Sequence, residues 1–307
     1  MFPQRIISVS DLSDDQIGEV ITCAKKFEKT LSGKQPLPRV LEGKVIATLF
    51  FQPSTRTRLS FEAAALKLGG EVLSMENAEI NSSTAKGESI EDTVMTVGQY
   101  TDLIIIRHYD QESVAKAALV SPKPIINAGD GTGEHPTQAL LDLYTIKKRL
   151  GRMNNFKIGI VGDLKNGRTT HSLIKLLARF EKVDFTFISP AGLTVPDWLR
   201  QELDSKNIPF REVTNLAKYL SELDVLYMTR IQQEYMDKDE YQKYQSVYCL
   251  DQVGVKQMKE SAIVMHPLPR VDEITRSVDL DPRAAYFDQV RSGLCVRMAL
   301  LKLILDR

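Results

Sequence analysis

Apolar and polar positions along the chain follow two alternating patterns. Short apolar runs bounded by turn residues predict buried strands at 44–51, 71–75, 102–106, 124–128, 156–161, 184–189, 209–213, 224–229 and 262–266. The segments between them have apolar residues at helical spacing. They predict helices at 14–31, from the end of the first strand to about 68, and at 89–100, 111–120, 136–150, about 170–180, 196–206, about 214–222 and 291–306. Strands that alternate with helices indicate an α/β protein with a doubly wound parallel sheet in each half.

Three of these helices have further sequence signals. The first begins at the capping-box pattern that starts with Ser13. The second is expected to have Leu59, Ala63 and Leu66 on one face and to stop at Gly69-Gly70. The long amphipathic helix at 136–150 ends before a glycine, and we expect it to bridge two domains.

Composition narrows the class of protein. A length of 307 residues suggests about two domains, and the formal net charge of zero gives no support for nucleic acid or an anionic membrane as partner. We find no signal peptide and no apolar stretch approaching about 18 residues, so no membrane association is expected. Neither the cysteines nor the four histidines have metal-ligand or disulfide-framework spacing, which favours a reducing cytosol and no metal. The cysteines are Cys23, Cys249 and Cys295.

The segment Ser54-Thr55-Arg56-Thr57-Arg58 follows the first apolar strand directly and opens a helix. A helix N-terminus presents backbone N–H groups and the positive end of the helix dipole, so it suits an anion such as phosphate. Arginine adds a permanently charged, forked donor. The alternative is an ordinary Ser or Thr cap beside two exposed arginines. We favour phosphate binding because hydroxyl and guanidinium groups are concentrated there.

Two other segments are candidates for function. The polar loop at 76–88 is long for a domain of this kind, and it is either functional or a surface connection. The glycine-rich turn at 129–133 leads to His135, Pro136 and Gln138. Pro136 suits the first position of a helix, so His135 and Gln138 can face the same ligand one turn apart. The alternative is a local cap with an exposed histidine.

The segment 159–169 resembles a dinucleotide-binding turn but lacks the G-x-G-x-x-G spacing, and no acidic residue ends the next strand. We therefore do not expect NAD. Four arginines, Arg56, Arg107, Arg168 and Arg230, each lie just past the end of a predicted strand. Doubly wound sheets collect those ends at one edge. One such arginine is usually a surface residue, but four in a chain of zero net charge suggest a site for a phosphate together with a dicarboxylate.

Taken together, the motifs resemble those of the aspartate/ornithine carbamoyltransferase family, and most closely those of aspartate carbamoyltransferase catalytic chains. S-T-R-T-R, H-P-x-Q, G-D-L-K-x-G-R-T, T-R-x-Q and H-P-L-P occur in that order along essentially the whole chain. The resemblance implies transfer of a carbamoyl group from carbamoyl phosphate to L-aspartate, an early step of pyrimidine synthesis, without a cofactor or metal. It implies a carbamoyl phosphate-binding domain (1–135 with the C-terminal helix 291–307), an interdomain helix (136–150) and an aspartate-binding domain (151–290), with the active site in the cleft between the domains.

The same resemblance assigns roles to individual residues. Phosphate would be held by Ser54, Thr55, Arg56 and Thr57, and the carbonyl oxygen by Thr57, Arg107 and His135. The carbamoyl nitrogen would be held by Gln138 and the backbone carbonyls of Leu268 and Pro269. The aspartate carboxylates would be held by Arg168, Arg230 and Gln232. Lys86 is implied to reach the active site of a neighbouring subunit, which makes the working unit a homotrimer with shared active sites.

Some alternatives remain open from the sequence. The loop before Lys86 is one residue shorter than in some family members, so the implied active-site serine is either Ser82 or Ser83. An ornithine carbamoyltransferase would need a carboxylate where this chain has Arg230, and its H-C-L-P and S-M-G signatures are missing. A non-catalytic homologue that acts as an assembly scaffold would not need the complete set of charged residues. The sequence leaves open whether separate regulatory chains bind.

Overall fold

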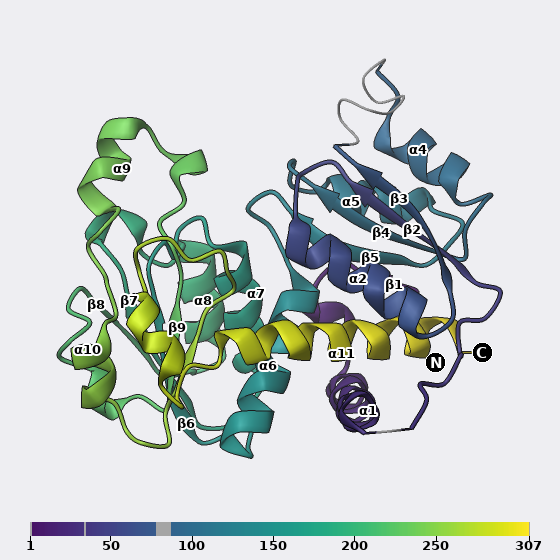
Figure 1. Cartoon of the computed structure of the whole chain (residues 1–307). Coiled ribbons are helices and arrows are strands. Elements are labelled where there is room, and N and C mark those ends of the chain that lie inside the picture. The colour runs from purple at the N-terminus through teal and green to yellow at the C-terminus, as the bar shows by residue number, and fades with distance from the viewer. Residues whose placement is uncertain (1, 34, 78–86, 307) are drawn as a thin grey trace. The chain divides into compact units, whose positions relative to one another are not determined.

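The chain folds into two units in this computed structural model, which describes residues 2–33, 35–77 and 87–306. Unit 1 comprises Met1–Tyr144 and Val290–Arg307, and unit 2 comprises Thr145–Gln289. Figure 1 shows the helices and strands of both units. Each unit contains one five-stranded sheet in which every described strand pair is parallel, as predicted for a doubly wound α/β protein.

The sheet of unit 1 has the strand order β1-β5-β4-β2-β3. Its strands are β1 (Arg5–Ile6), β2 (Val45–Phe50), β3 (Glu71–Glu76), β4 (Leu103–His108) and β5 (Ile125–Asp130). The predictions missed only β1, which is two residues long and too short for a periodic pattern. β2, β4 and β5 are buried along nearly their whole length, which explains their almost continuous apolar sequences.

Helices cover both faces of this sheet. On one face, α4 (Ile90–Val97) and α5 (Ser113–Val120) pack with alternate residues of β2 and β4, such as Leu49 and Ile106. On the other face lies α2 (Thr55–Lys67), whose Glu62 carboxylate accepts a hydrogen bond from Thr48 of β2 at 3.0 Å. The predicted helix at 14–31 is α1 (Asp14–Ser32), and Ser13 forms the expected capping box.

The apolar face noted in the sequence of α2 is not the face that the helix buries. Leu59 and Leu66 are exposed, while the helix buries Thr57, Phe61, Ala64 and Ala65. The helix contains apolar residues around much of its circumference, so its spacing alone does not decide which side packs. The buried side places Phe61 one turn after Thr57, which turns the Thr57 side chain toward the protein interior.

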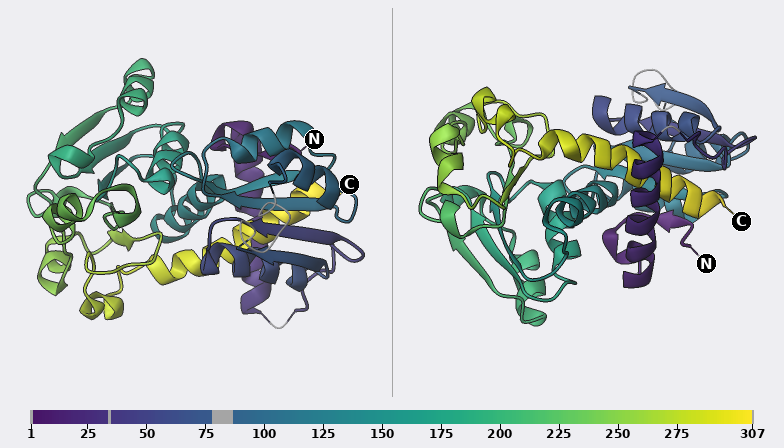
Figure 2. Two further views of the ribbon diagram at one scale, coloured as in Figure 1. Left: turned by 90° about the horizontal axis from the view of Figure 1, so that it is seen from above. Right: turned by 60° about the horizontal axis from the view of Figure 1, so that its bottom comes forward.

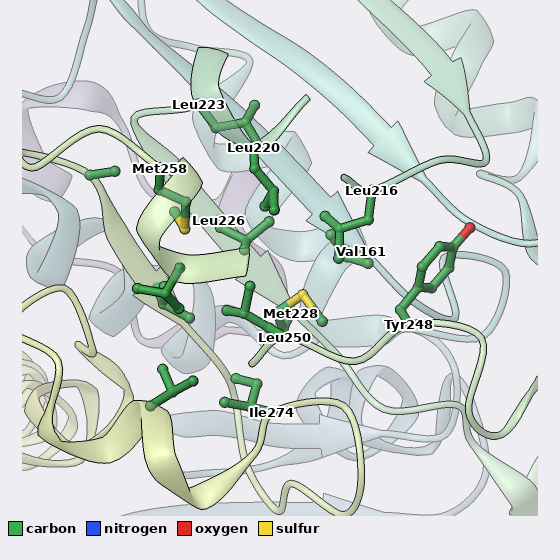
Figure 3. Close-up of a cluster of buried hydrophobic side chains, with 14 of the residues drawn as sticks. Val161, Leu216, Leu220, Leu223, Leu226, Met228, Tyr248, Leu250, Met258 and Ile274 are labelled. Atoms are coloured by element: carbon green, nitrogen blue, oxygen red, sulfur yellow. The ribbon is translucent and has the colours of Figure 1, made fainter. Parts of the chain in front are cut away.

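The sheet of unit 2 has the order β10-β9-β6-β7-β8. Its strands are β6 (Phe156–Val161), β7 (Val183–Ile188), β8 (Phe210–Val213), β9 (Val225–Met228) and β10 (Ile263–Met265), all at predicted positions. One face packs on a buried apolar cluster in which Val161, Leu226 and Met228 meet Leu220 and Leu250 (Figure 3).

The helices of unit 2 differ more from the predictions. α7 (Arg168–Leu177) and α8 (Asp197–Ser205) are present, but the predicted helix at 214–222 is reduced to a 3₁₀ turn, η4 (Leu220–Glu222). That turn supplies Leu220 to the apolar cluster, so the apolar residues of this segment pack from a loop. The short helices α9 (Lys238–Tyr244) and α10 (Gln252–Gln257) were not predicted.

The division between the units falls inside two long helices. α6 (Pro136–Leu150) begins at Pro136 as predicted, and α11 (Tyr286–Leu305) begins earlier than the predicted 291. Both ends of the chain lie in unit 1 (Figure 2). Within the described part of the chain, no helix is long and apolar enough to cross a membrane.

Candidate functional site

Each sheet has one place where the direction of strand addition reverses. In unit 1 the chain runs from β2 outward to β3 and then returns to β4 on the other side of β2. In unit 2 it runs from β6 outward to β7 and β8 and then returns to β9 on the other side of β6. Ligands of open α/β sheets bind at the carboxyl ends of such strand pairs. All four arginines that the sequence placed at strand ends belong to these two pairs.

The S-T-R-T-R segment forms the turn from β2 into α2. Ser54 is the N-cap residue with an extended backbone, and Arg58 N–H bonds its carbonyl at 3.1 Å, but the Ser54 side chain makes no capping bond. The ordinary-cap alternative is therefore wrong for Ser54. Thr55 and Arg56 are exposed and Thr57 is buried. The segment thus has exposed Thr55 and Arg56 side chains at a helix N-terminus, where an anion is favoured.

The two arginines of this segment have different environments. Arg58 is tied into unit 1, with Nη2 at 2.7 Å from the Glu76 carboxylate and Nη1 donating to Ser74 Oγ at 3.1 Å. Both partners lie on β3. Arg56 is exposed at the start of the helix. Arg58 therefore fastens α2 to the sheet, whereas the binding role expected for Arg56 stays a prediction.

Arg107 lies between the strands that carry the other unit 1 candidates. It pairs in register with Phe50 at the end of β2, and its carbonyl accepts Phe51 N–H at 2.9 Å. Its Nη1 donates to the carbonyl of Ala128 on β5 at 3.2 Å. Arg107 is therefore held at the end of β4, beside the strand that precedes the S-T-R-T-R turn and the strand that leads to His135.

His135 directly precedes α6, and its carbonyl accepts the N–H groups of Gln138 at 3.0 Å and Ala139 at 3.2 Å. The side chain of His135 is buried, so the alternative of an exposed capping histidine is wrong. Gln138 follows one turn later, also buried, and its Nε2 donates to Asp142 Oδ1 at 3.0 Å. The turn before His135 is held by Asp130, whose carboxylate accepts Glu134 N–H at 2.6 Å.

In unit 2, the loops that follow β6 and β9 meet at Gly162. This residue has φ +120°, and a Cβ there would lie within 3.0 Å of the carbonyl oxygen and the hydroxyl of Thr229. Thr229 in turn donates its N–H to the Val161 carbonyl at 2.8 Å. The glycine that looked like part of a dinucleotide-binding turn is thus required for close approach of two backbones.

Asp163 joins the same two loops. It is fully buried and accepts Asn166 N–H at 3.0 Å, as well as the backbone N–H of Gln232. Burial raises the pKa of this carboxyl, while the hydrogen bonds from Asn166 and Gln232 work in the opposite direction. Asp163 therefore fixes the loop that leads to Arg168 against the loop that carries Gln232.

Arg168 is the first residue of α7, and Arg230 follows β9. Both Nη groups of Arg230 bond the carboxylate of Glu234, with Nη1 to Oε2 at 2.9 Å. Burial raises the pKa of Glu234, but the Arg230 bond and the charges of Arg230 and Arg168 outweigh it and hold that pKa below its usual value. The Glu234 carboxylate therefore interacts electrostatically with both Arg230 and Arg168.

The H-P-L-P segment follows β10 and is anchored through His266. Leu268 N–H donates to His266 Nδ1 at 2.7 Å, so the opposite ring nitrogen, Nε2, is the donor to Glu273 Oε1, also at 2.7 Å. Burial raises the pKa of Glu273, but the interaction with His266 and the backbone N–H donors outweigh burial and hold that pKa below its usual value. His266 and Glu273 thus position the backbone of Leu268 and Pro269.

The predicted residues form two sets, one in each unit. Unit 1 holds Ser54, Thr55, Arg56, Thr57, Arg107, His135 and Gln138, and unit 2 holds Arg168, Arg230, Gln232, Leu268 and Pro269. Lys86, Ser82 and Ser83 lie outside the described residues. The predicted cleft depends on the placement of one unit against the other and stays a prediction.

Sequence reasoning missed four acidic residues that hold the predicted ones in place. Glu234 bonds Arg230, Asp163 bonds the Gln232 backbone, Glu273 bonds His266, and Asp142 bonds Gln138. Two of these bonds could have been predicted from the sequence, because Glu234 and Asp142 each lie four residues after their partner, at helical spacing. Among the residues that the structure describes, no group of three or more His, Cys, Asp or Glu side chains is arranged to hold a metal ion.

Comparison with known proteins identifies both halves of the chain. Residues 4–148 match the family model "Aspartate/ornithine carbamoyltransferase, carbamoyl-P binding domain". Residues 154–304 match "Aspartate/ornithine carbamoyltransferase, Asp/Orn binding domain". Together the two models span nearly the whole sequence.

Individual relatives are similar to this chain over nearly their full length. The aspartate carbamoyltransferase catalytic subunit of Clostridium novyi is 48% identical over 98% of this chain and 98% of its own. The catalytic subunit of aspartate transcarbamoylase from M. jannaschii has a TM-score of 0.91 at 46% identity, covering 99% of this chain and 98% of that one. Aspartate transcarbamoylase from Trypanosoma cruzi, in complex with carbamoyl phosphate and aspartate, has a TM-score of 0.87 at 37% identity, covering 98% and 96%. The chain therefore belongs to the aspartate/ornithine carbamoyltransferase family.

Proposed function

We propose that this chain is an aspartate carbamoyltransferase, which transfers the carbamoyl group of carbamoyl phosphate to the amino group of L-aspartate. A C–N bond forms between the aspartate nitrogen and the carbamoyl carbon, and the bond from that carbon to the phosphate oxygen breaks. The amine loses one proton, which the departing phosphate can accept. The products are N-carbamoyl-L-aspartate and phosphate, and the reaction belongs to pyrimidine synthesis.

We assign carbamoyl phosphate to the unit 1 residues. Ser54, Thr55, Arg56 and Thr57 lie at the N-terminus of α2, where phosphate is stabilised by N–H groups, the helix dipole and the guanidinium. The support for this assignment is that Ser54 does not cap the helix with its own side chain and that Arg56 is exposed. The negative charge that builds on the departing phosphate would be stabilised by the same groups.

The carbonyl oxygen of the carbamoyl group becomes negative as the amine attacks. Thr57, Arg107 and His135 are the donors that we assign to this oxygen. Arg107 lies on β4, whereas Thr57 and His135 follow the two neighbouring strands, β2 and β5; Thr57 and His135 are buried. Donors fixed in advance around a developing oxyanion typically contribute on the order of 10²–10³ in rate each. Gln138 and the carbonyls of Leu268 and Pro269 would hold the carbamoyl nitrogen.

We assign the two aspartate carboxylates to Arg168, Arg230 and Gln232. The supporting observation is Glu234, a carboxylate whose pKa is lowered by both arginines. A substrate carboxylate at this place would gain from the same charges. The side-chain cation of ornithine would instead be repelled, since both arginines are permanently charged. This charge pattern is the observation that carries the choice of aspartate over ornithine.

An acceptor screen tests the proposal. The purified protein is given carbamoyl phosphate with aspartate, ornithine or another amino acid, and phosphate release and carbamoylated product are both measured. We expect turnover with aspartate and none with ornithine. Turnover with ornithine would replace the substrate assignment, and an absence of turnover with any acceptor would favour the non-catalytic scaffold.

We also propose a homotrimer in which Lys86 acts in the active site of the neighbouring subunit, as the family resemblance implies. Lys86→Ala and Arg56→Ala should each be inactive alone. Random mixed trimers at equal ratio should recover about one quarter of the sites, because an intact site needs one chain of each kind in the right order. Verified mixed trimers that recover no activity would contradict shared sites.

The cellular location of the protein and its regulation are also proposals. The described cysteines Cys23, Cys249 and Cys295 form no disulfide bond, and this supports a reducing compartment, for which we propose the cytosol. Separate regulatory chains would show themselves as proteins that co-purify with the trimer and change its aspartate saturation curve.

A further inference from the structure

A buried polar cluster lies behind Gln138 in unit 1. Gln138 Nε2 donates to Asp142 Oδ1 at 3.0 Å, and Asp142 is fully buried. Pairs of Gln and Asp at this spacing are common on exposed helix faces, where they contribute only about 0.2–0.5 kcal/mol. Here both side chains are buried, and a buried carboxylate is costly unless its charge is compensated. The burial of the Gln138–Asp142 pair therefore suggests a role other than helix stabilisation.

Arg297 of α11 is a buried cation that interacts electrostatically with Asp142. Its side chain is 4% exposed, and its guanidinium lies 5.0 Å from the centre of the Phe61 ring on α2. Burial lowers the pKa of Arg297 to about 10, and the charge of Asp142 opposes that shift, so the guanidinium is protonated at neutral pH. A Cβ on Gly293 would approach Arg297 Nη1 to 2.8 Å, so the glycine leaves room for this side chain.

The chemistry of the amide explains what the cluster achieves. An ionised carboxylate only accepts hydrogen bonds, so Asp142 must face the NH₂ end of the Gln138 amide. The oxygen end of the same planar group then faces away from Asp142. The carbamoyl group presents an NH₂ donor, which needs an acceptor. If the amide were reversed, two donors would face each other.

We infer that Asp142 is a positioning residue for carbamoyl transfer: it fixes Gln138 with its amide oxygen toward the carbamoyl NH₂, while Arg297 balances the buried charge. The inference rests on the proposed function, because it assumes that Gln138 contacts the carbamoyl nitrogen. Asp142 itself touches no substrate and acts through Gln138. Arg297 acts only through Asp142. Its guanidinium also contacts Phe61 of α2, the helix that begins at the phosphate-binding turn.

The test is a double-mutant cycle read by kcat/KM for carbamoyl phosphate with saturating aspartate. Asp142→Asn keeps the size of the side chain, but its amide can donate or accept, so Gln138 loses its fixed orientation. We expect kcat/KM to fall by about 10- to 100-fold, the usual cost of a mispaired buried group. In a Gln138→Ala background the same substitution should change kcat/KM by less than about twofold, because the residue through which it acts is gone.

A second variant separates positioning from folding. Asp142→Asn leaves Arg297 buried without its counter-charge, so it will also lower the melting temperature. Combining it with Arg297→Met removes both charges and should restore stability, because no buried charge is then left without a counter-charge. The inference requires kcat/KM to stay low in this stable double variant. Asp102→Asn is the control: this carboxylate of unit 1 accepts Val45 N–H at 2.9 Å, so its loss should affect stability and leave kcat/KM unchanged.

The outcomes are distinct. Non-additive losses in the cycle, with activity still low in the stabilised variant, support the inference. Additive losses, or activity that returns together with stability, overturn it and leave Asp142 with a purely structural role. Wild-type protein that transfers no carbamoyl group refutes the proposed function, and with it this inference, before any variant is compared.

Discussion

Replacing Gly162 by alanine tests whether the aspartate half of the site depends on the close approach of two loops. The added Cβ would lie within 3.0 Å of the carbonyl oxygen and hydroxyl of Thr229. One of these atoms belongs to the backbone, so the overlap cannot be relieved by a rotation of the side chain alone. The loop that continues into Arg230 must move instead.

Two costs add up in this variant. Holding an alanine at φ +120°, a region essentially restricted to glycine, costs about 1–3 kcal/mol. Overpacking at a tight contact costs about 1–3 kcal/mol more. We therefore expect Gly162→Ala to destabilise unit 2 by about 2–6 kcal/mol. If the protein still folds, the displaced Arg230 should raise the KM for aspartate by about tenfold or more, while the KM for carbamoyl phosphate stays the same.

Two other glycines separate these costs. Gly151 has φ +75° with open space around its Cβ position, so Gly151→Ala should cost only about 1–2 kcal/mol from the backbone. Gly18 lies inside α1 with open space and no positive φ, so Gly18→Ala should stabilise by about 0.5–1 kcal/mol. The assay is denaturant unfolding together with steady-state kinetics. If Gly162→Ala costs no more than Gly151→Ala and leaves the aspartate KM unchanged, the argument from close approach is refuted.

Three more substitutions test single side chains. Arg56→Ala should lower kcat by about 10²–10³ and leave the melting temperature unchanged, because the side chain is exposed; near-normal turnover would remove Arg56 from the phosphate site. Glu234→Gln weakens the two-point hold on Arg230 and should raise the aspartate KM by about tenfold, with an unchanged aspartate KM as the contrary result. Because the pKa of Glu273 is lowered in the folded state, its bond to His266 stabilises the protein above pH 4.5 and that stability is lost as the pH falls below this value. Glu273→Gln should therefore have a lower free energy of unfolding than wild type near pH 7, and the difference should shrink below about pH 4.5. Unfolding curves measured at several pH values test this. A difference that does not change with pH would contradict the assignment.

The features that followed from the sequence depend on local order along the chain. All nine predicted strands are present, because buried parallel strands have apolar runs with clear ends. Arg107 and Arg230 could be placed at strand ends by the same reasoning, and the topology of doubly wound sheets then set them at the strand pairs where ligands bind. No knowledge of tertiary contacts was needed for either step.

The features that were missed depend on contacts between distant parts of the chain. Arg297 and Asp142 are far apart in sequence, and neither is unusual in its own segment. Leu59 lies on the apolar face noted in the sequence but is exposed, because α2 has several apolar sides and only packing against the sheet decides which one is buried. The helix expected at 214–222 gives way to a loop because its apolar residues reach the core cluster without completing helical turns.

The division of the chain into units has a consequence for synthesis on the ribosome. Unit 2 is one continuous stretch, whereas unit 1 needs both Met1–Tyr144 and Val290–Arg307. Arg297, which interacts electrostatically with Asp142, belongs to the later of these two segments. Domains tend to fold as their sequences emerge from the ribosome. The unit that starts first on the growing chain is therefore the one that is completed last, after the whole of unit 2 has been made.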